Sequence, residues 1–160
     1  MNMNKNMGST NPEDGILIDS SYCLETLSES VRYYEWIYGL MRPYLGARVV
    51  ELGAGIGNLT TLLLGEERTV VAIDTDERLI ARHRQRVSAS NRLITECVSL
   101  QQLAGRLSYR EQFDSVISAN VLEHIPDEEQ DEVLASSFDV LCPGGYSIHW
   151  VPAFESLYGS

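Results

Sequence analysis

The strongest constraint on this chain is the stretch 49–58, which reads Val-Val-Glu-Leu-Gly-Ala-Gly-Ile-Gly-Asn. A short apolar run ends in an acid and is followed by glycines at alternate positions, Gly53, Gly55 and Gly57. An apolar run beside glycines that tolerate left-handed backbone predicts a buried strand that ends in a tight turn. Residues 59–64 are predicted to continue as a helix whose N-terminal amides point back at the turn. A ligand can approach bare backbone at such a junction.

Length and composition predict one globular domain. The chain has 160 residues, 44% of them hydrophobic, so it can bury a core without disulfides or a metal ion. We expect a flexible N-terminal tail at 1–21 and a folded core at 22–160. The 3 cysteines lack CxxC spacing, which favours reduced thiols and a cytoplasmic location. No apolar run is long enough for membrane insertion, and no metal site is predicted.

The charge is large and unevenly distributed. A net charge of −11 argues against nucleic acid as a partner. Residues 1–110 contain all 12 basic residues and 13 of the 23 acidic residues, so the other 10 acids lie in 111–160, which has no Lys or Arg. This acidic stretch predicts either a solvated helix face or a surface that meets a basic partner.

An amphipathic helix is predicted over 24–45, before the glycine turn. Its apolar stripe consists of Leu24, Leu27, Val31, Tyr34, Tyr38 and Met41. Pro43 is expected to end this helix. Core packing is the expected role of its aromatics, and a lid over a flat cofactor is the alternative. These aromatics are Tyr33, Tyr34, Trp36 and Tyr38.

Strands and helices alternate along the rest of the chain. Further strands are predicted at 69–74, 93–98, 113–119 and 146–151, and further helices at 77–87 and 127–141. In the helix 127–141, Leu134, Phe138 and Leu141 are expected to face inward, and Pro143-Gly144-Gly145 is expected to end it. This order predicts an α/β fold, a three-layer Rossmann-like sheet of mainly parallel strands with helices on both faces. A ligand is then expected at the carboxyl ends of the strands.

Two cofactor classes compete for the glycine turn. A dinucleotide-binding turn has the spacing GxGxxG, as in NAD-dependent dehydrogenases, whereas this chain has Glu51-x-Gly-x-Gly-x-Gly. Asp74 follows at the interval at which an acid on the second strand reaches ribose hydroxyls. The turn resembles motif I of the class I S-adenosylmethionine-dependent methyltransferases. The blocks 113–125 and 141–145 strengthen this resemblance, which extends over residues 22–160 and points to the small-molecule branch of that family.

The resemblance implies a role for each matching residue on the cofactor side. Gly53, Gly55 and Gly57 would let the methionine part of S-adenosylmethionine lie against backbone. Glu51 would organise the turn or reach the cofactor's amino group through water. Asp74 would accept both ribose hydroxyls.

The remaining matches fall on three other loops. Thr75 would line the adenine pocket, and Asn120 with Val121 would approach the methionine moiety. Ser99 occupies the region where the family often has an acid that holds the adenine amino group, which is a departure from the pattern.

Methyl transfer depends largely on alignment of an acceptor with the methyl group. An oxygen or nitrogen acceptor also loses a proton, for which His124 or Glu123 is the candidate base, although His124 could instead be a packing residue. His83 and His149 are weaker candidates. The expected activity is transfer to a small-molecule acceptor, O-, N- or C-methylation being undetermined, with S-adenosylhomocysteine as product. The alternative is a non-catalytic cofactor-binding or protein-interaction module.

The family usually has seven strands in the order 3-2-1-4-5-7-6, and this chain supplies the first five. The resemblance therefore implies a core that lacks the last two strands, with strand five as an exposed edge. A fragment, a short form completed by another chain or by a second copy, and a non-catalytic remnant are the alternatives.

Overall fold

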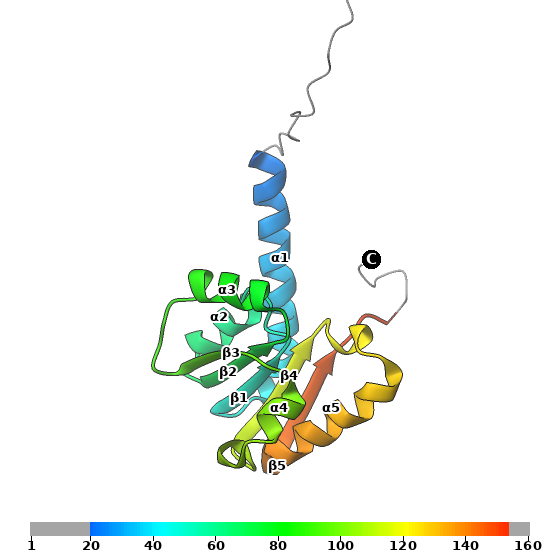
Figure 1. Ribbon diagram of the computed structural model, residues 1–160. Helices are drawn as coiled ribbons and strands as arrows, with labels where there is room; N and C mark the ends of the chain where they lie inside the picture. The colour runs from blue at the N-terminus through cyan, green and yellow to red at the C-terminus, as the bar shows by residue number, and fades with distance from the viewer. Residues whose placement is uncertain (1–19, 154–160) are drawn as a thin grey trace, which may run out of the picture.

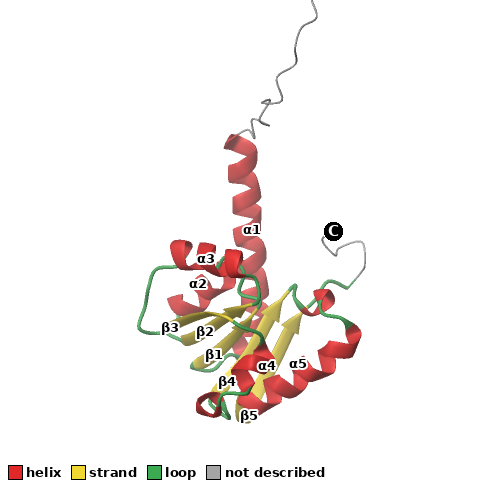
Figure 2. Cartoon of the chain, in the orientation of Figure 1, coloured by secondary structure: helices red, strands yellow, loops and turns green. Residues whose placement is uncertain are grey.

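Five parallel strands form the centre of the molecule, a computed structural model that describes residues 20–153 (Figure 1, Figure 2). The sheet order is β3-β2-β1-β4-β5, and every pairing is parallel. Both the predicted fold class and the predicted order of the first five strands are confirmed, with β5 at an edge of the sheet. The strands are β1 (Arg48–Leu52), β2 (Thr69–Asp74), β3 (Leu93–Cys97), β4 (Phe113–Ala119) and β5 (Leu141–Trp150).

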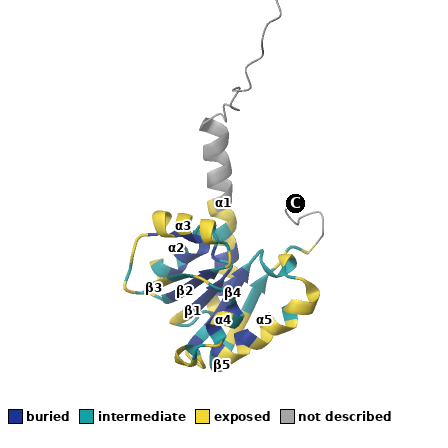
Figure 3. Cartoon of the chain, in the orientation of Figure 1, coloured by how far each residue is buried: buried dark blue, intermediate teal, exposed yellow. Residues whose placement is uncertain are grey.

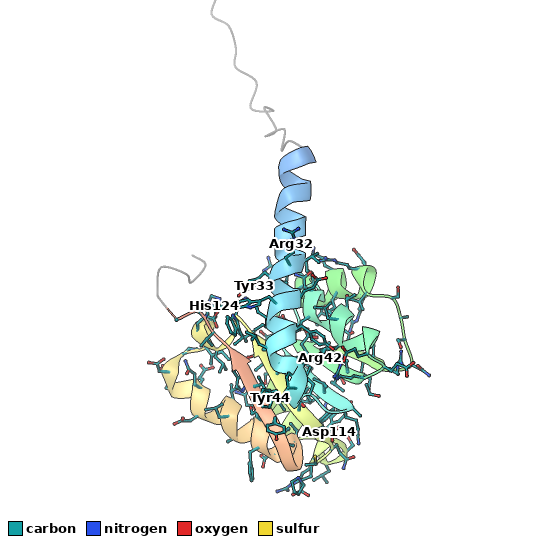
Figure 4. All side chains as sticks on the ribbon, turned by 180° about the vertical axis from the view of Figure 1, so that it is seen from behind. Arg32, Tyr33, Arg42, Tyr44, Asp114 and His124 are labelled. Atoms are coloured by element: carbon teal, nitrogen blue, oxygen red, sulfur yellow. The ribbon has the colours of Figure 1, made fainter. Side chains whose placement is uncertain are left out.

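Helices cover both faces of this sheet. Figure 1 shows α4 and α5 in front of the sheet and α1 behind it, and Figure 4 shows α1 from the other side. Short 3₁₀ turns occur at Arg42–Tyr44, Leu107–Tyr109 and Leu122–His124. The helices are α1 (Ser20–Met41), α2 (Asn58–Gly65), α3 (Glu77–Arg86), α4 (Leu100–Ala104) and α5 (Asp127–Val140).

The alternation of side chains along each strand divides the core into two apolar clusters. Val49 points toward α1 and α2, where Ile37 and Leu63 are buried, whereas Val50 points toward α4 and α5. Figure 3 shows the buried residues concentrated on the strands and on the helix sides that face them. Burial on both faces explains why the strands have continuous apolar sequences.

Helix α1 agrees with the prediction only in its second half. Ile37, Tyr38 and Met41 are buried, and the helix ends just before Pro43. Val31 is 48% exposed, contrary to its predicted place in the apolar stripe, and Figure 1 shows the helix extending past the end of the sheet. Within α1, side chains are described from Val31 onward, so the predicted contacts of Leu24 and Leu27 lie outside the described residues, as do residues 1–19 of the predicted tail.

Helix α5 packs on a different face from the predicted one. Leu134 is 45% exposed and Phe138 is 80% exposed, so the prediction that they face inward is wrong. The buried face is made by Val133, Ser136, Ser137 and Val140. Small serines fit closely against the sheet, and the Ser137 hydroxyl donates to the Val133 carbonyl oxygen at 3.0 Å, which satisfies its polar atom.

Two further differences lie at the ends of predicted elements. Helix α5 ends at Val140 and β5 begins at Leu141, so Pro143-Gly144-Gly145 lies within the strand instead of ending the helix. An edge strand tolerates proline, and the pairing of β5 with β4 shifts register at this point. Helix α4 was not predicted because it has only five residues, too few for an apolar period.

Candidate functional site

A cavity of about 520 Å³ lies at the carboxyl ends of β1, β2 and β4. Parallel α/β sheets bind ligands at this edge, because the loops that leave the strands meet there. The lining includes most of the residues that the sequence predicted for a cofactor site. These residues are Gly53, Gly55, Asp74, Thr75, Ser99, Asn120, Val121 and His124.

The three glycines of the turn have different surroundings. Gly55 has a φ of +53°, and a Cβ built on it would meet nothing within 4 Å, so its backbone is open to the cavity. Gly57 has a φ of +88°, and a Cβ there would overlap Val87 of the loop after α3. Gly53 packs in the same close manner against Val121. Gly55 thus exposes backbone to a ligand, whereas the other two glycines allow the turn to pack.

Asp74 joins the glycine turn to the end of β2. One carboxylate oxygen accepts a hydrogen bond from the Gly55 amide at 2.9 Å, and the other accepts one from the Asp76 amide at 2.9 Å. Asp76 in turn caps α3 by accepting from the Arg78 amide at 2.8 Å. Each carboxylate oxygen of Asp74 retains a lone pair, so the side chain can still accept bonds from a ligand in the cavity.

Glu51 lies behind the turn and is 3% exposed. Its Oε2 lies 2.5 Å from Thr60 Oγ1. Glu51 also lines a second cavity, of about 340 Å³, which shares Gly53 and Gly55 with the 520 Å³ cavity. Burial, with a smaller contribution from the nearby Asp74 carboxylate, raises the pKa of Glu51 from 4.5 to about 8. Through Thr60, Glu51 is therefore joined to the first turn of α2, directly after the glycine turn.

The side of the cavity nearest β2 and β3 carries hydroxyl groups. Thr75 is exposed at the end of β2, and its carbonyl oxygen accepts from Cys97 Sγ at 3.6 Å. Ser99 forms a capping box at the start of α4: its Oγ accepts from the Gln102 amide at 3.2 Å, while its own amide donates to Gln102 Oε1. The Ser99 hydroxyl proton is still available to a ligand.

The end of β4 is held by α1 and β5. Asn120 has a φ of +56°, and its amide donates to the Trp150 carbonyl oxygen at 2.9 Å. The Tyr33 hydroxyl donates to Asn120 Oδ1 at 2.9 Å, and Trp150 Nε1 donates to that hydroxyl at 3.2 Å. Trp36 stacks edge-on against Trp150 at 4.9 Å between ring centroids. Tyr33 and Trp36 of α1 thus form an aromatic wall with Trp150 beside Asn120, and Tyr34 of the same helix lines the cavity.

The two candidate bases occupy different environments. His124 is exposed and lines the large cavity, on the 3₁₀ turn that follows β4. Figure 4 shows His124 and Tyr33 near the same end of the sheet. Glu123 is partly buried outside the cavity lining, and its Oε2 has no hydrogen-bond partner among residues 20–153. The structure therefore brings His124, and not Glu123, to the predicted cofactor residues.

The other histidines lie away from this cavity. His83 is fully buried against Thr60, and burial lowers its pKa. His149 lies between the hydroxyls of Ser118 and Ser147, and burial lowers its pKa as well.

Within residues 20–153, His, Cys, Asp and Glu side chains form no group of three or more that could hold a metal ion. No helix in that same part of the chain is long and apolar enough to cross a membrane.

Comparison with known proteins identifies the family. The family described as methyltransferase domain matches residues 50–147, from β1 to β5. The chain belongs to this methyltransferase family. The match includes the glycine turn, Asp74 and the end of β4, so the residues that line the cavity lie within the matched range, except Tyr34 of α1.

Several curated relatives are methyltransferases. An uncharacterized methyltransferase of Oceanobacillus iheyensis is 26% identical over 109 residues, which cover 68% of this chain and 48% of that protein. The ubiquinone biosynthesis O-methyltransferase of Thiobacillus denitrificans is 30% identical over 105 residues, which cover 65% of this chain and 44% of that protein. This chain thus spans about half the length of the curated relatives it matches.

Solved structures share the fold. A glycopeptide N-methyltransferase solved with S-adenosylmethionine has a TM-score of 0.61 at 21% identity, and the match covers 74% of this chain and 53% of that chain. A protein from Pyrococcus horikoshii has a TM-score of 0.64 at 23% identity, and the match covers 88% of this chain and 59% of that chain. At these identities the likeness shows a common three-layer sheet.

Sequence reasoning missed the side chains that hold the site from behind. Thr60 had no distinguishing feature, and His83 was a weak catalytic candidate, yet both support Glu51. Trp150 was seen only as part of a strand, although it bonds to Tyr33, which is 117 residues away in the sequence. The crowding of aromatics in α1 was the one indication that this helix borders the site.

Proposed function

We propose that this methyltransferase domain binds S-adenosylmethionine in the 520 Å³ cavity and transfers its methyl group to a small-molecule acceptor, with S-adenosylhomocysteine as product. The observation that carries the proposal is the convergence of Gly55 and Asp74. An open, left-handed glycine and a carboxylate bonded to its amide lie at the carboxyl edge of the sheet. The volume is within the range of about 300–1,000 Å³ typical of ligand pockets.

The residues present fit this cofactor. Asp74 would hold the ribose hydroxyls, Thr75 and Ser99 would line the adenine end, and Glu51 would attract the ammonium group at the other end. Asn120 would border the methionine part, since its Oδ1 is fixed by Tyr33 and its side chain lines the cavity. The cofactor, when bound, supplies an electrophilic methyl group on a sulfonium centre.

Catalysis by the chain's own residues consists of positioning and proton removal. The wall formed by Tyr33, Trp36 and Trp150 would orient an acceptor beside Asn120. His124 would take the proton that an oxygen or nitrogen acceptor gives up, because its imidazole is exposed and lines the cavity on the 3₁₀ turn that follows β4. The curated relatives include an O-methyltransferase and a glycine N-methyltransferase, which fits an oxygen or nitrogen acceptor.

The test is calorimetric titration with S-adenosylmethionine and S-adenosylhomocysteine. Asp74→Asn should weaken both ligands by about 10- to 100-fold, as expected for hydrogen bonds to a charged group. Asp114→Asn is the matched control: Asp114 also accepts a backbone amide near β1, from Arg48 at 2.8 Å, but it lies at the opposite end of the sheet. Asp114→Asn should leave both affinities unchanged.

Failure of the wild-type chain to bind either ligand would contradict the proposal. Equal losses in Asp74→Asn and Asp114→Asn would contradict the assignment of the site. Binding without methyl transfer to phenolic, amine or glycine-like acceptors would favour the alternative, a cofactor-binding module without catalysis.

A further inference from the structure

Three buried polar side chains form a connected network behind the glycine turn. Glu51 on β1 is 3% exposed, and Thr60 on α2 and His83 on α3 are 0% exposed. Thr60 Oγ1 lies 2.5 Å from Glu51 Oε2 and 2.9 Å from His83 Nε2. One hydroxyl group therefore joins a carboxyl on the central strand to an imidazole on the second helix that follows it.

This network contacts the site that we assign to the cofactor. Glu51 lines the 340 Å³ cavity, which shares Gly53 and Gly55 with the larger one. His83 lies against the far side of the same turn, where a Cβ on Gly57 would come within 3.1 Å of its Nε2. The turn is thus held between the cavity and a fully buried histidine.

The hydroxyl of Thr60 has one proton, so it can donate to only one of its two partners. When Glu51 is ionised, Thr60 donates to the carboxylate and His83 Nε2–H donates to Thr60. When Glu51 is protonated, Glu51 donates to Thr60 and Thr60 donates to an unprotonated Nε2, while His83 Nδ1–H faces Thr95 Oγ1 at 3.4 Å. Both arrangements satisfy the Thr60 hydroxyl, and they differ by one proton, which passes to solvent.

The surrounding charges affect which arrangement the free protein adopts. Burial raises the pKa of Glu51 to about 8 and lowers the pKa of His83. Asp74 faces the network from β2 and raises both pKa values, whereas Arg84 on α3 lowers that of His83. Arg82, also on α3, lines the same cavity as Glu51. A ligand ammonium group placed beside Glu51 would favour the ionised arrangement.

We propose that Thr60 and His83 are positioning residues for the amino-acid end of the cofactor. Thr60 holds the Glu51 carboxyl in one orientation and donates to it as a carboxylate when the ligand's ammonium group binds, and His83 supports this arrangement by donating to Thr60. This inference rests on the proposed function and goes beyond it, because it assigns a role to two buried residues that do not touch the ligand.

The affinities of two ligands distinguish this positioning role from a general structural role of Thr60. S-adenosylhomocysteine carries the amino-acid group, whereas 5′-methylthioadenosine has the same adenosine and thioether without it. Thr60→Val keeps the shape of the side chain and removes the hydroxyl, and it should weaken S-adenosylhomocysteine by about tenfold. Its affinity for 5′-methylthioadenosine should stay within about twofold of wild type, and Thr60→Ser should restore tight binding.

A second measurement uses the wild-type chain alone. Calorimetry in buffers of different ionisation enthalpy counts the protons released on binding. Near pH 7, below the Glu51 pKa of about 8, S-adenosylhomocysteine should release a proton and 5′-methylthioadenosine should release none.

His83→Leu should reduce affinity for S-adenosylhomocysteine alone, and His83→Gln, which can still donate to Thr60, should recover part of it.

The outcomes are distinguishable from failure of the proposed function. If neither ligand binds wild type, the cofactor assignment itself is wrong. If both ligands bind and Thr60→Val weakens them equally or not at all, the cofactor site stands and the positioning role is overturned. The same holds if both ligands release equal numbers of protons.

Discussion

Two cavities of similar volume lie at opposite ends of the sheet. One has about 520 Å³ and is formed by the loops at the carboxyl ends of β1, β2 and β4. The other has about 510 Å³ and is formed by the segment before β1 and by the first residues of β4 and β5, with Asp114 in its lining. Figure 4 shows His124 and Tyr33 near the first end and Tyr44 and Asp114 near the second. Volume alone therefore does not indicate which cavity holds a ligand.

The difference lies in what each cavity offers to a ligand. The carboxyl-end cavity is lined by the glycine turn that leads into α2 and by Leu79 in the first turn of α3, and backbone amides at a helix N-terminus favour anionic groups. It also has Asp74, Ser99 and His124 on separate loops. In the amino-end cavity, Asp114 accepts from the Arg48 amide and from Cys142 Sγ, and a Cβ on Gly46 would overlap it. The Asp114 carboxylate of β4 therefore connects this strand to β1 and β5.

The largest expected difference between the two cavities comes from a pair of glycine variants. Gly55 and Gly144 both have positive φ, and a Cβ on either would meet nothing within 4 Å, but they line opposite cavities. Valine at either position should cost about 1–2 kcal/mol in the free energy of unfolding, because a left-handed backbone disfavours side chains. Only Gly55→Val should reduce S-adenosylhomocysteine affinity, by about 100-fold or more, measured by calorimetry. Comparable losses in both variants would show that the two ends are not distinct.

The buried acid of the carboxyl end gives a pH-dependent prediction. The folded-state pKa of Glu51 is about 8, above its ordinary value of 4.5, so the folded protein binds this proton more tightly than the unfolded chain. Its contribution to stability is fully present below pH 4.5 and is lost as the pH rises toward 8. Glu51→Gln cannot lose a proton, so it should gain about 3–4 kcal/mol relative to wild type between pH 5 and pH 8. Urea unfolding at both pH values measures this, and a constant difference would contradict it.

The smallest expected effect concerns two tyrosine hydroxyls. Tyr33→Phe removes the bonds to Asn120 and Trp150, and should cost about 0.5–1.5 kcal/mol in the free energy of unfolding and raise the KM for the acceptor. Tyr44→Phe is the matched control: it lies beside Tyr146 at the amino end and should change neither quantity measurably. Thermal melts and steady-state kinetics would check the pair. A larger effect from Tyr44→Phe would contradict the assignment of the acceptor side.

The sequence predicted the parts of the site that depend on local pattern. The strand that ends at Leu52, the glycine turn and Asp74 follow from apolar runs and spacing, and the structure brings them to one cavity. The contacts that hold them could not be predicted, because they join residues far apart in the chain. Thr60 and His83 are 23 residues apart, and Tyr33 and Asn120 are 87 apart.

In helix α5, hydrophobic periodicity alone predicts the wrong buried face. Leu134 and Phe138 form the more apolar stripe, yet Val133, Ser136 and Ser137 are buried. Small side chains allow the helix to lie close to the sheet, and the Ser137 hydroxyl bonds within the helix. Hydrophobicity scales do not account for this closeness, so the error arose from packing and not from the choice of element.

The most direct test of the central claim is to map which backbone amides respond to S-adenosylhomocysteine in two-dimensional NMR spectra of the labelled protein. We expect the largest shift changes in 53–57, 74–76 and 120–124, which surround the carboxyl-end cavity. Changes confined to 43–47 and 142–146, around the amino-end cavity, would contradict the account.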